Sequence, residues 1–286
     1  MKVLELHNKN LDYKQFIKRS AREEDCEVLL TEPVIGVEGN EIKFVYDFLP
    51  DSVNTSALVE AFKTIKYTKG KRARGLYSQS RIFGYKPRLE MRGDFCSSTS
   101  LSNEFPKENA VVCSFAGEIE KIYKDKSPEA YEKHRGEVHE KVLDSYRMTK
   151  DSVFTSGIIN KNNPLKYHFD TGNFNKVYSC MPVFKSGIKG GYLSLPEYGV
   201  KIELRDRSIF MFDGQSIMHG VTPIVYESPN SYRYSAVYYS LKRMWQCLEI
   251  DEELARIRNK KTKREKERIN MPPEKLKQLK DRYGKQ

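Results

Sequence analysis

The stretch that decides the fold is Tyr167-His168-Phe169-Asp170, which is followed 49 residues later by His219. Two imidazoles and one carboxylate are a ligand set that holds a ferrous ion from one side and leaves the opposite positions open. His168 and Asp170 are two residues apart, so on an extended strand their side chains point to the same face. The pattern therefore predicts a metal site with room for further ligands.

The residues around His219 strengthen this prediction. The apolar run Ile209–Phe212 reads as a buried strand, and it leads through the turn at Asp213-Gly to His219. Further on, Arg233 opens an alternating strand, where a buried arginine needs an anionic partner. We expect Arg233 to clamp the far carboxylate of a co-substrate bound to the metal. The four residues together favour an oxygenase that uses Fe(II), 2-oxoglutarate and dioxygen.

The other histidines lack this context. His7 is near the start of the chain, and His134 and His139 fall in a charged stretch that reads as a helix from Pro128 to Lys150. A spacing of five does not place them on one helical face. We expect them to be structural.

Short β-rich segments with intervening turns fill residues 153–241. A block of this size matches the two-sheet jelly roll in which such metal sites are built. Before it, residues 26–30 and 42–46 read as strands, and residues 56–67 read as a helix with Ser56 as a possible cap. The predicted class is therefore α+β, a double-stranded β-helix core flanked by helices.

The domain boundaries follow from composition. We expect one oxygenase domain over residues 1–245, with the jelly-roll core at about 150–242, and a charged helical tail over 246–286. The tail holds 13 Lys and Arg against 7 Asp and Glu from Asp251 onward, which is more than half of the chain's net charge of +11. It is either an exposed helical extension or a nonspecific DNA-binding arm.

Charge and cysteine content bound the partners and the location. A net charge of +11 on 286 residues points to a polyanion as partner. The five cysteines are scattered without a Cys-x-x-Cys pair, so we expect reduced thiols in an intracellular protein, cytoplasmic or nuclear. The chain shows no secretory leader and no apolar run long enough to span a membrane, so no membrane partner is expected.

Residues 69–92 are basic and punctuated by glycine, which predicts a loop. Cationic and aromatic side chains there would contact phosphates and stack on a displaced base, or the stretch is a solvated basic loop.

Several ordered stretches resemble the TET/J-binding-protein family of Fe(II)/2-oxoglutarate oxygenases, which act on the 5-methyl group of pyrimidines in nucleic acid. The matching stretches are Ser80-Arg-Ile-Phe-Gly84 with Pro87-Arg88 and Cys96, Thr155–Asn160, His168–Asn173, Gly190-Gly191, Leu195–Tyr198, His219–Pro223 and Arg233–Tyr239. They extend over roughly residues 81–239.

The resemblance implies that His168, Asp170 and His219 bind iron and that Arg233 binds the C5 carboxylate of 2-oxoglutarate. It also implies base contacts by Asn173 and Tyr239, and we include Arg81 among the substrate-binding residues. Taken alone, Asn173 would be a turn residue and Tyr239 a core aromatic. Two positions after Tyr239 the animal enzymes carry a histidine that contacts cytosine, whereas this chain has Leu241. Thymine and 5-methylcytosine therefore both stay open as substrates.

The leading hypothesis is a dioxygenase that hydroxylates the 5-methyl group of a pyrimidine in DNA, either duplex with a flipped base or single-stranded. An alternative keeps the iron chemistry but hydroxylates a protein side chain or a small molecule, because fold does not fix substrate. A noncatalytic DNA-binding module is a third possibility, which the four filled catalytic positions disfavour.

Overall fold

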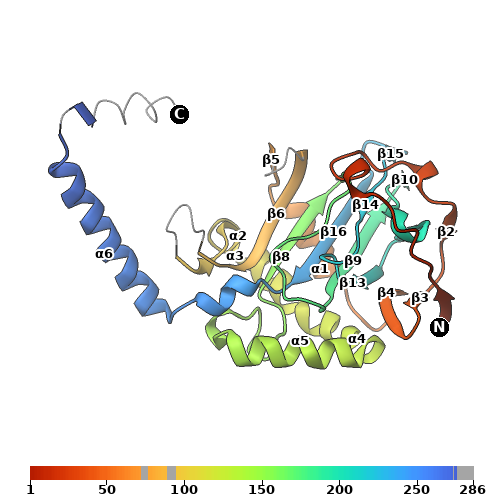
Figure 1. The fold of residues 1–286 in the computed structure, drawn as a ribbon, viewed down its shortest axis with the longest axis horizontal. Coiled ribbons are helices and arrows are strands. Elements are labelled where there is room, and N and C mark those ends of the chain that lie inside the picture. Colours follow the sequence, from red (N-terminus) through yellow and green to blue (C-terminus); the bar gives the residue numbers. More distant parts are fainter. Residues whose placement is uncertain (72–76, 89–94, 273, 276–286) are drawn as a thin grey trace.

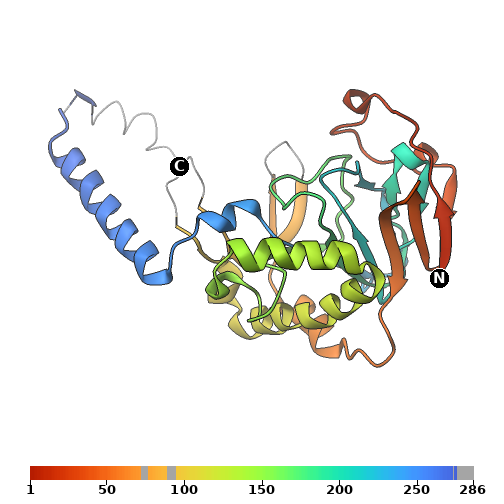
Figure 2. The ribbon, with the colours of Figure 1, turned by 60° about the horizontal axis from the view of Figure 1, so that its bottom comes forward.

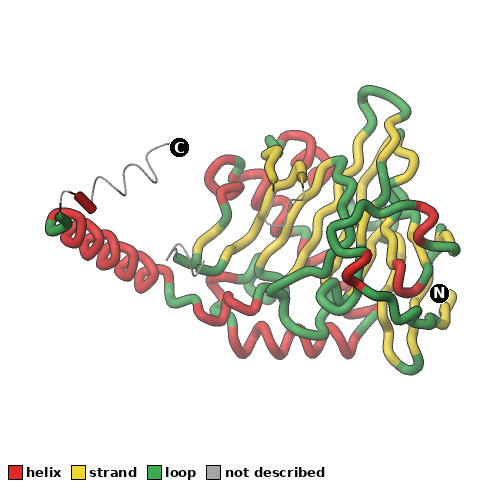
Figure 3. Tube along the Cα trace, turned by 45° about the horizontal axis from the view of Figure 1, so that its top comes forward, coloured by secondary structure: helices red, strands yellow, loops and turns green. Residues whose placement is uncertain are grey.

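A computed structural model of the chain describes residues 1–71, 77–88, 95–272 and 274–275. Its centre is a large, mainly antiparallel sheet whose strands lie side by side (Figures 1 and 3). In spatial order these strands are β1 (Lys2–Glu5), β3 (Val34–Glu38), β4 (Glu41–Phe48), β13 (Ser208–Phe212), β9 (Ser179–Ser186), β16 (Tyr232–Tyr239), β8 (Ser156–Lys161), β6 (Tyr77–Lys86) and β5 (Thr68–Lys71), with β7 (Ser97–Ser98) paired to β6.

Two smaller sheets complete the β structure. One contains, in order, β14 (Gly220–Val221), β11 (Leu193–Leu195), β12 (Val200–Ile202) and β2 (Val28–Leu30), and the other pairs β10 (Ile188–Gly190) with β15 (Ile224–Tyr226). Side chains of β11 and β12 share one hydrophobic cluster with Phe44, Met181 and Phe210 of the large sheet. The four-stranded sheet therefore packs against one face of the large sheet.

Helices cover the other face (Figure 2). They are α1 (Ser56–Thr64), α2 (Ser100–Glu104), α3 (Pro106–Ser114), α4 (Ala116–Lys126) and α5 (Pro128–Lys141). Buried residues such as Phe62, Ile119 and Tyr123 form a single cluster with Phe184 and Tyr238 of the sheet. This burial removes apolar surface from water on the helix-covered face.

Strand β16 shows how the two faces are separated. Tyr234 and Tyr238 point toward the helices, where the Tyr238 hydroxyl donates to the Val112 carbonyl oxygen at 2.9 Å. Because side chains alternate along a strand, Arg233 and Tyr239 lie on the opposite face. That face is the one toward the four-stranded sheet.

Most predicted elements around the site are present. Strands occur at β2, β4, β13 and β16, and the chain from β8 to β16 is rich in strands, as predicted. The helix at residue 56 forms, but its N-cap is Thr55, and Asn54 accepts the hydrogen bond from the Ser56 amide at 3.0 Å. The helix from Pro128 ends at Lys141, short of the predicted Lys150.

The prediction of a loop over residues 69–92 is wrong for β5 and β6, which form an antiparallel pair. Gly84 has φ +73°, and a Cβ there would meet the Thr155 carbonyl oxygen at 2.7 Å. This glycine allows two strands to approach closely and does not mark a loop. Residues 72–76 and 89–94 of the basic stretch lie outside the described residues.

The prediction of five reduced cysteines is also wrong, because Cys96 and Cys247 form a disulfide with a Cα–Cα distance of 5.6 Å. The two residues are 151 positions apart, so no local spacing could reveal the pair. Cys26, Cys113 and Cys180 are buried free thiols.

The C-terminal part of the chain leaves the body of the molecule. Helix α6 (Ile250–Ile269) projects beyond the edge of the large sheet in all three views (Figures 1–3). Residues 276–286 of the predicted tail lie outside the described residues. No helix in the part of the chain that the structure describes is long and apolar enough to cross a membrane.

Candidate metal and co-substrate site

The structure brings His168, Asp170 and His219 together. One ligand atom from each lies within 4.8 Å of the others, and this is the one such group among the described residues. The Asp170 Oδ1 atom is 3.8 Å from His168 Nε2 and 3.9 Å from His219 Nε2. The three ligand atoms lie close enough for small side-chain rotations to bring each of them to about 2 Å from one ion.

The two histidines are held by backbone pairing. The amide of His168 donates to the carbonyl oxygen of His219 at 2.9 Å, and the reverse bond is 3.1 Å long. This two-residue antiparallel bridge replaces the longer strand predicted at His168. It sets both imidazoles side by side, with ring centroids 4.3 Å apart.

Backbone carbonyls also orient each imidazole ring. Nδ1 of His168 is 2.8 Å from the Lys166 carbonyl oxygen, and Nδ1 of His219 is 2.9 Å from that of Ile217. A carbonyl only accepts, so Nδ1 carries the proton in each ring and Nε2 keeps its lone pair. Both Nε2 atoms are therefore available to a metal, the arrangement found around metal-ligating histidines.

Burial keeps His219 neutral. Its pKa is lowered to about 4, first because burial penalises the charged form and then because His168 is close, while Asp170 raises it. A neutral imidazole is the form that binds a metal.

The Asp170 carboxylate is positioned by the turn after β13. The Asp170 amide donates to the Gly214 carbonyl oxygen at 2.8 Å. A Cβ at position 214 would lie 2.4 Å from Asp170 Oδ2, so only glycine leaves space for this carboxylate. Asp213 stabilises the turn by accepting from the Gln215 amide at 3.0 Å and the Ser216 hydroxyl at 2.6 Å.

Arg233 is a buried cation with no anionic partner in the part of the chain that the structure describes. It is only 2% exposed, and its Nε and Nη2 atoms have no hydrogen-bond partner within the described part of the chain. Burial lowers its pKa to about 10. Gly191, at φ +66°, lies against its side chain, where a Cβ would be 3.4 Å from Cδ. Because an unpaired buried charge is costly, this guanidinium fits a ligand carboxylate.

Glu197 was not predicted to have a role, although it lies in a stretch quoted for the resemblance. Its carboxylate accepts from the Met218 amide at 2.9 Å and from the Tyr13 hydroxyl at 2.8 Å. Burial raises its pKa. Tyr13 also packs edge-on against Phe169, with centroids 5.1 Å apart. Through these contacts Glu197 links the N-terminal segment at Tyr13 to the segment that bears His219, and Tyr13 in turn contacts the segment that bears His168 and Asp170.

Of the predicted base-contacting residues, Asn173 follows the metal ligand Asp170 by three positions. The backbone of Gly172 and Phe174 pairs with Lys242 and Ser240, just after β16, and Asn173 bridges Leu241 directly. Asn173 is buried, and its Nδ2 donates to the Ser179 hydroxyl at 3.2 Å. Leu241 is half-buried beside it, whereas Tyr239 lies on the same face of β16 as Arg233.

Arg81 lies elsewhere. It pairs in register with Ile159, whose side chain belongs to the helix-side core, and its guanidinium forms an ion pair with Glu104 of α2. Its own side chain is buried. The structure therefore does not bring Arg81 together with the other predicted site residues.

Comparison with known proteins identifies the family of the chain. Residues 92–242, just over half of the chain, match the Tet_JBP family model, described as the oxygenase domain of the 2OGFeDO superfamily. The chain is 26% identical over 198 residues to thymine dioxygenase JBP1 of Trypanosoma brucei brucei. That match covers 67% of this chain and 22% of the relative, so the chain spans less than a quarter of the protein that it matches.

A solved structure of a TET protein resembles the fold. NgTET1, solved in complex with 5mC DNA, superposes with a TM-score of 0.56 at 16% identity over 77% of this chain and 84% of that one. A 2OG-Fe(II) oxygenase family protein from Burkholderia pseudomallei gives 0.45 at 12% identity over 68% and 85% of the two chains. The chain belongs to the TET/JBP family of dioxygenases, whose metal, co-substrate and oxidant are Fe(II), 2-oxoglutarate and dioxygen.

Proposed function

We propose that this chain hydroxylates the 5-methyl group of a pyrimidine base in DNA, giving the 5-hydroxymethyl base. The observation that carries the oxygenase half is the metal-ligand group, with its two free Nε2 atoms, together with the unpaired guanidinium of Arg233. The names of the relatives, a thymine dioxygenase and a protein in complex with 5mC DNA, support the choice of substrate. The net charge of +11 is consistent with it.

The roles of the residues follow from their chemistry. His168, Asp170 and His219 would hold the iron through Nε2, a carboxylate oxygen and Nε2. Arg233 would pair with the distal carboxylate of 2-oxoglutarate, which removes the cost of its buried charge. When bound, iron and 2-oxoglutarate would supply the chemistry by which dioxygen oxidises a C–H bond, with succinate and carbon dioxide as co-products.

The base would be bound beside the metal segment. A methyl group stacked inside a duplex cannot reach a buried site, so the nucleotide has to be flipped out, at a cost of a few kcal/mol, or be single-stranded. Asn173 has amide atoms suited to the edge of a base, and Tyr239 an aromatic ring. We do not include Arg81, because its ion pair with Glu104 directs it to the helix-covered face.

Leu241 bears on which base is oxidised. It bridges Asn173 and offers no hydrogen-bonding group to a base edge. An apolar side chain there gives cytosine no specific partner, so thymine is the first base to test and 5-methylcytosine the second.

We also propose the domain plan. Residues 1–245 would form one oxygenase domain, with a jelly-roll core at about 150–242 and a helical tail over 246–286. Support comes from the single hydrophobic cluster between the large and four-stranded sheets. The DNA partner, and not the cysteines, is the ground on which we propose a cytoplasmic or nuclear location.

The test is mass spectrometry of nucleosides from DNA that contains both thymine and 5-methylcytosine. The DNA is incubated with the protein, Fe(II), 2-oxoglutarate and oxygen, and His168→Ala serves as the control. We expect a 5-hydroxymethyl nucleoside from the unaltered chain alone, and its identity gives the base. Succinate release without any modified nucleoside would show that another molecule, such as a protein side chain or metabolite, is the substrate.

A further inference from the structure

We propose that the segment from η5 (Lys242–Gln246) through α6 is an arm that binds the phosphate backbone of duplex DNA outside the base pocket. The identification of the polyanion as DNA rests on the proposed function. The binding itself rests on three independent features of the arm: its charge, its attachment and its exposed aromatic ring.

The charge of α6 is concentrated in its middle. Between residues 256 and 264 it has six basic side chains and no acidic one. Four of them, Arg256, Lys260, Lys263 and Arg264, recur at the spacing of one helical face. None of the four forms an ion pair with any residue in the described ranges. An unneutralised basic stripe of this kind complements the row of phosphates along DNA.

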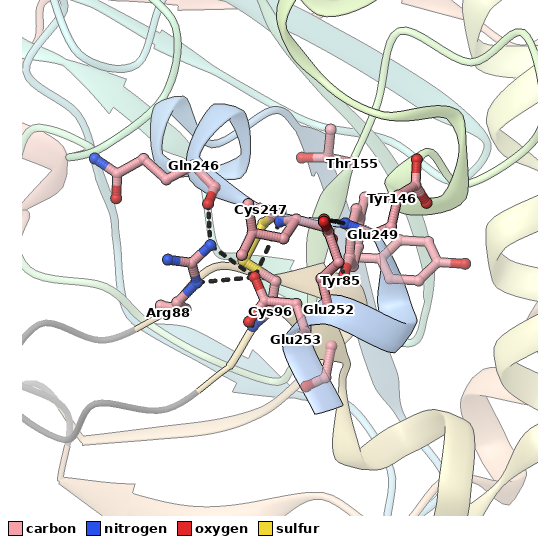
Figure 4. Close-up of a disulfide and its surroundings, with 12 residues drawn as sticks. Tyr85, Arg88, Cys96, Tyr146, Thr155, Gln246, Cys247, Glu249, Glu252 and Glu253 are labelled. Carbon is pink, nitrogen blue, oxygen red and sulfur yellow. Dashed lines mark hydrogen bonds and ion pairs between the residues drawn. A yellow bond between two sulfur atoms is a disulfide. The ribbon is translucent and has the colours of Figure 1, made fainter. Parts of the chain in front are cut away.

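The root of the arm is fixed to the oxygenase domain (Figure 4). Glu253 is 1% exposed, and its carboxylate accepts from Arg88 Nε at 2.9 Å and from the Leu248 amide at 3.0 Å. The Cys96–Cys247 disulfide lies beside this ion pair. The arm therefore starts in a defined position, and less conformational freedom is lost when it binds a ligand.

The reach of the arm sets the length of DNA that it needs. Helix α6 has 20 residues, which corresponds to about 30 Å at 1.5 Å per residue. It begins nine residues after Leu241 in the sequence and projects away from the domain (Figure 1). A helix of this length extends along nearly one turn of duplex, about 34 Å. The arm should thus contact DNA several base pairs from the flipped base.

Trp245 lies in η5, where the arm begins. It is the single tryptophan of the chain, its side chain is 47% exposed, and its ring packs edge-on against Phe174 with centroids 6.1 Å apart. Phe174 directly follows Asn173. An exposed indole next to a basic helix suits stacking against an unpaired base or a sugar. Its position also makes tryptophan emission a reporter for DNA at this surface alone.

The experiment titrates the full chain, without iron or co-substrate, with duplexes of about 12 and about 30 base pairs. The test variant is Lys260→Ala/Lys263→Ala/Arg264→Ala. A matched control, Lys121→Ala/Lys124→Ala/Lys133→Ala, removes the same charge from exposed positions on α4 and α5. Anisotropy of labelled DNA gives the affinities at several salt concentrations, and tryptophan emission is followed in parallel.

We expect the test variant to bind the long duplex at least about tenfold more weakly, with a salt slope smaller by 2 to 3, because each lost phosphate contact lowers the slope by about 0.9. The short duplex should be affected much less, and the control variant should match the unaltered chain. DNA should quench Trp245, and Trp245→Phe should weaken binding by a few-fold. Circular dichroism confirms that the variants fold.

Equal affinities and slopes for the test and control variants would overturn the proposal, as would tryptophan emission that DNA leaves unchanged. These outcomes are separate from base oxidation. If the hydroxymethyl nucleoside forms but the arm variant binds normally, the proposed function stands and the arm proposal falls. If the arm binds DNA and no base is oxidised, the arm proposal stands and the proposed function falls.

Discussion

The two faces of the large sheet each bury a histidine, but the two imidazole rings differ in their hydrogen bonding. On the helix-covered side, His134 is fully buried between Tyr123 and Phe154, and neither ring nitrogen has a partner in the described residues. On the other side, His219 is also buried, yet its Nδ1 is bonded to a carbonyl and its Nε2 points toward Asp170. His219 therefore differs from His134 in having a ring nitrogen, Nε2, whose lone pair is oriented and available to a metal.

Two of the three buried arginines in the described residues, Arg81 and Arg233, show the same difference. Arg81, on the helix-covered side, forms an ion pair with Glu104, although its Nε atom, like that of Arg233, has no hydrogen-bond partner in the described residues. Arg233, on the opposite side, forms no ion pair with an acidic residue among the described residues. Burial of a polar group is thus a poor guide to function by itself. What matters is whether its partner is already present in the protein or is left for a ligand to supply.

The largest effect should come from Asp170→Ala, which removes a metal ligand. Turnover should fall by more than roughly 100-fold, which is the largest loss usually seen when a residue that only hydrogen-bonds to a metal ligand is replaced. DNA affinity should stay within about twofold, because phosphate contacts lie elsewhere. Single-turnover assays and anisotropy measure the two properties. Normal turnover in this variant would remove the basis for the metal assignment.

Arg233→Met should raise the KM for 2-oxoglutarate about 100-fold, since a buried charge-assisted pair is lost. In the absence of ligand the same change should stabilise the protein by about 1–3 kcal/mol, because it deletes an unpaired buried charge. Thermal unfolding with and without 2-oxoglutarate separates the two effects. The matched change Arg81→Met should leave this KM unaltered, and destabilisation by Arg233→Met without ligand would argue against an unpaired charge.

His134 should make stability depend on pH. Burial lowers its pKa from 6.5 to about 3, so the unfolded chain binds the proton more readily. Its contribution to stability is therefore complete above pH 6.5 and is lost as the pH falls toward 3. Between pH 7 and pH 5 the loss is about 2 kcal/mol. Urea unfolding at both pH values measures the free energy of unfolding. The original chain should lose about 2 kcal/mol more than His134→Phe between pH 7 and pH 5, and an equal loss in both proteins would contradict the prediction.

Gly214→Ala should produce the smallest effect, a weakening of Fe(II) binding by roughly tenfold. The added methyl group would occupy the space of Asp170 Oδ2 and displace the carboxylate. Titration with Fe(II) measures this affinity. Gly117→Ala, on α4 where a Cβ meets nothing within 4 Å, is the control. Equal iron affinities in the two variants would show that the Asp170 position tolerates adjustment.

Local patterns in the sequence predicted one face better than the other. The His168–Asp170 spacing, the buried strand before His219 and the alternation around Arg233 are all features of a few neighbouring residues, and the structure contains each of them. The helices α2, α3 and α4 were not predicted. α3 has almost no segregation of polar and apolar residues, and so carries little periodic signal.

Features that join distant parts of the chain could not be predicted. The Tyr13–Glu197 hydrogen bond and the Cys96–Cys247 disulfide span 184 and 151 positions, and no local pattern records either contact. The face occupied by Arg81 was missed for a related reason. Its direction depends on the register of β6 with β8, which fixes the side that each residue faces.

The most direct test of the contrast between the two faces is the yield of hydroxymethyl nucleoside per succinate released, measured for the original chain, Arg233→Met and Arg81→Met at low 2-oxoglutarate. We predict that the original chain and Arg81→Met form both products in near-equal amounts, while Arg233→Met forms almost none of either. Loss of product formation in a folded Arg81→Met, or its retention in Arg233→Met, would contradict the assignment of the site to the face that bears Arg233.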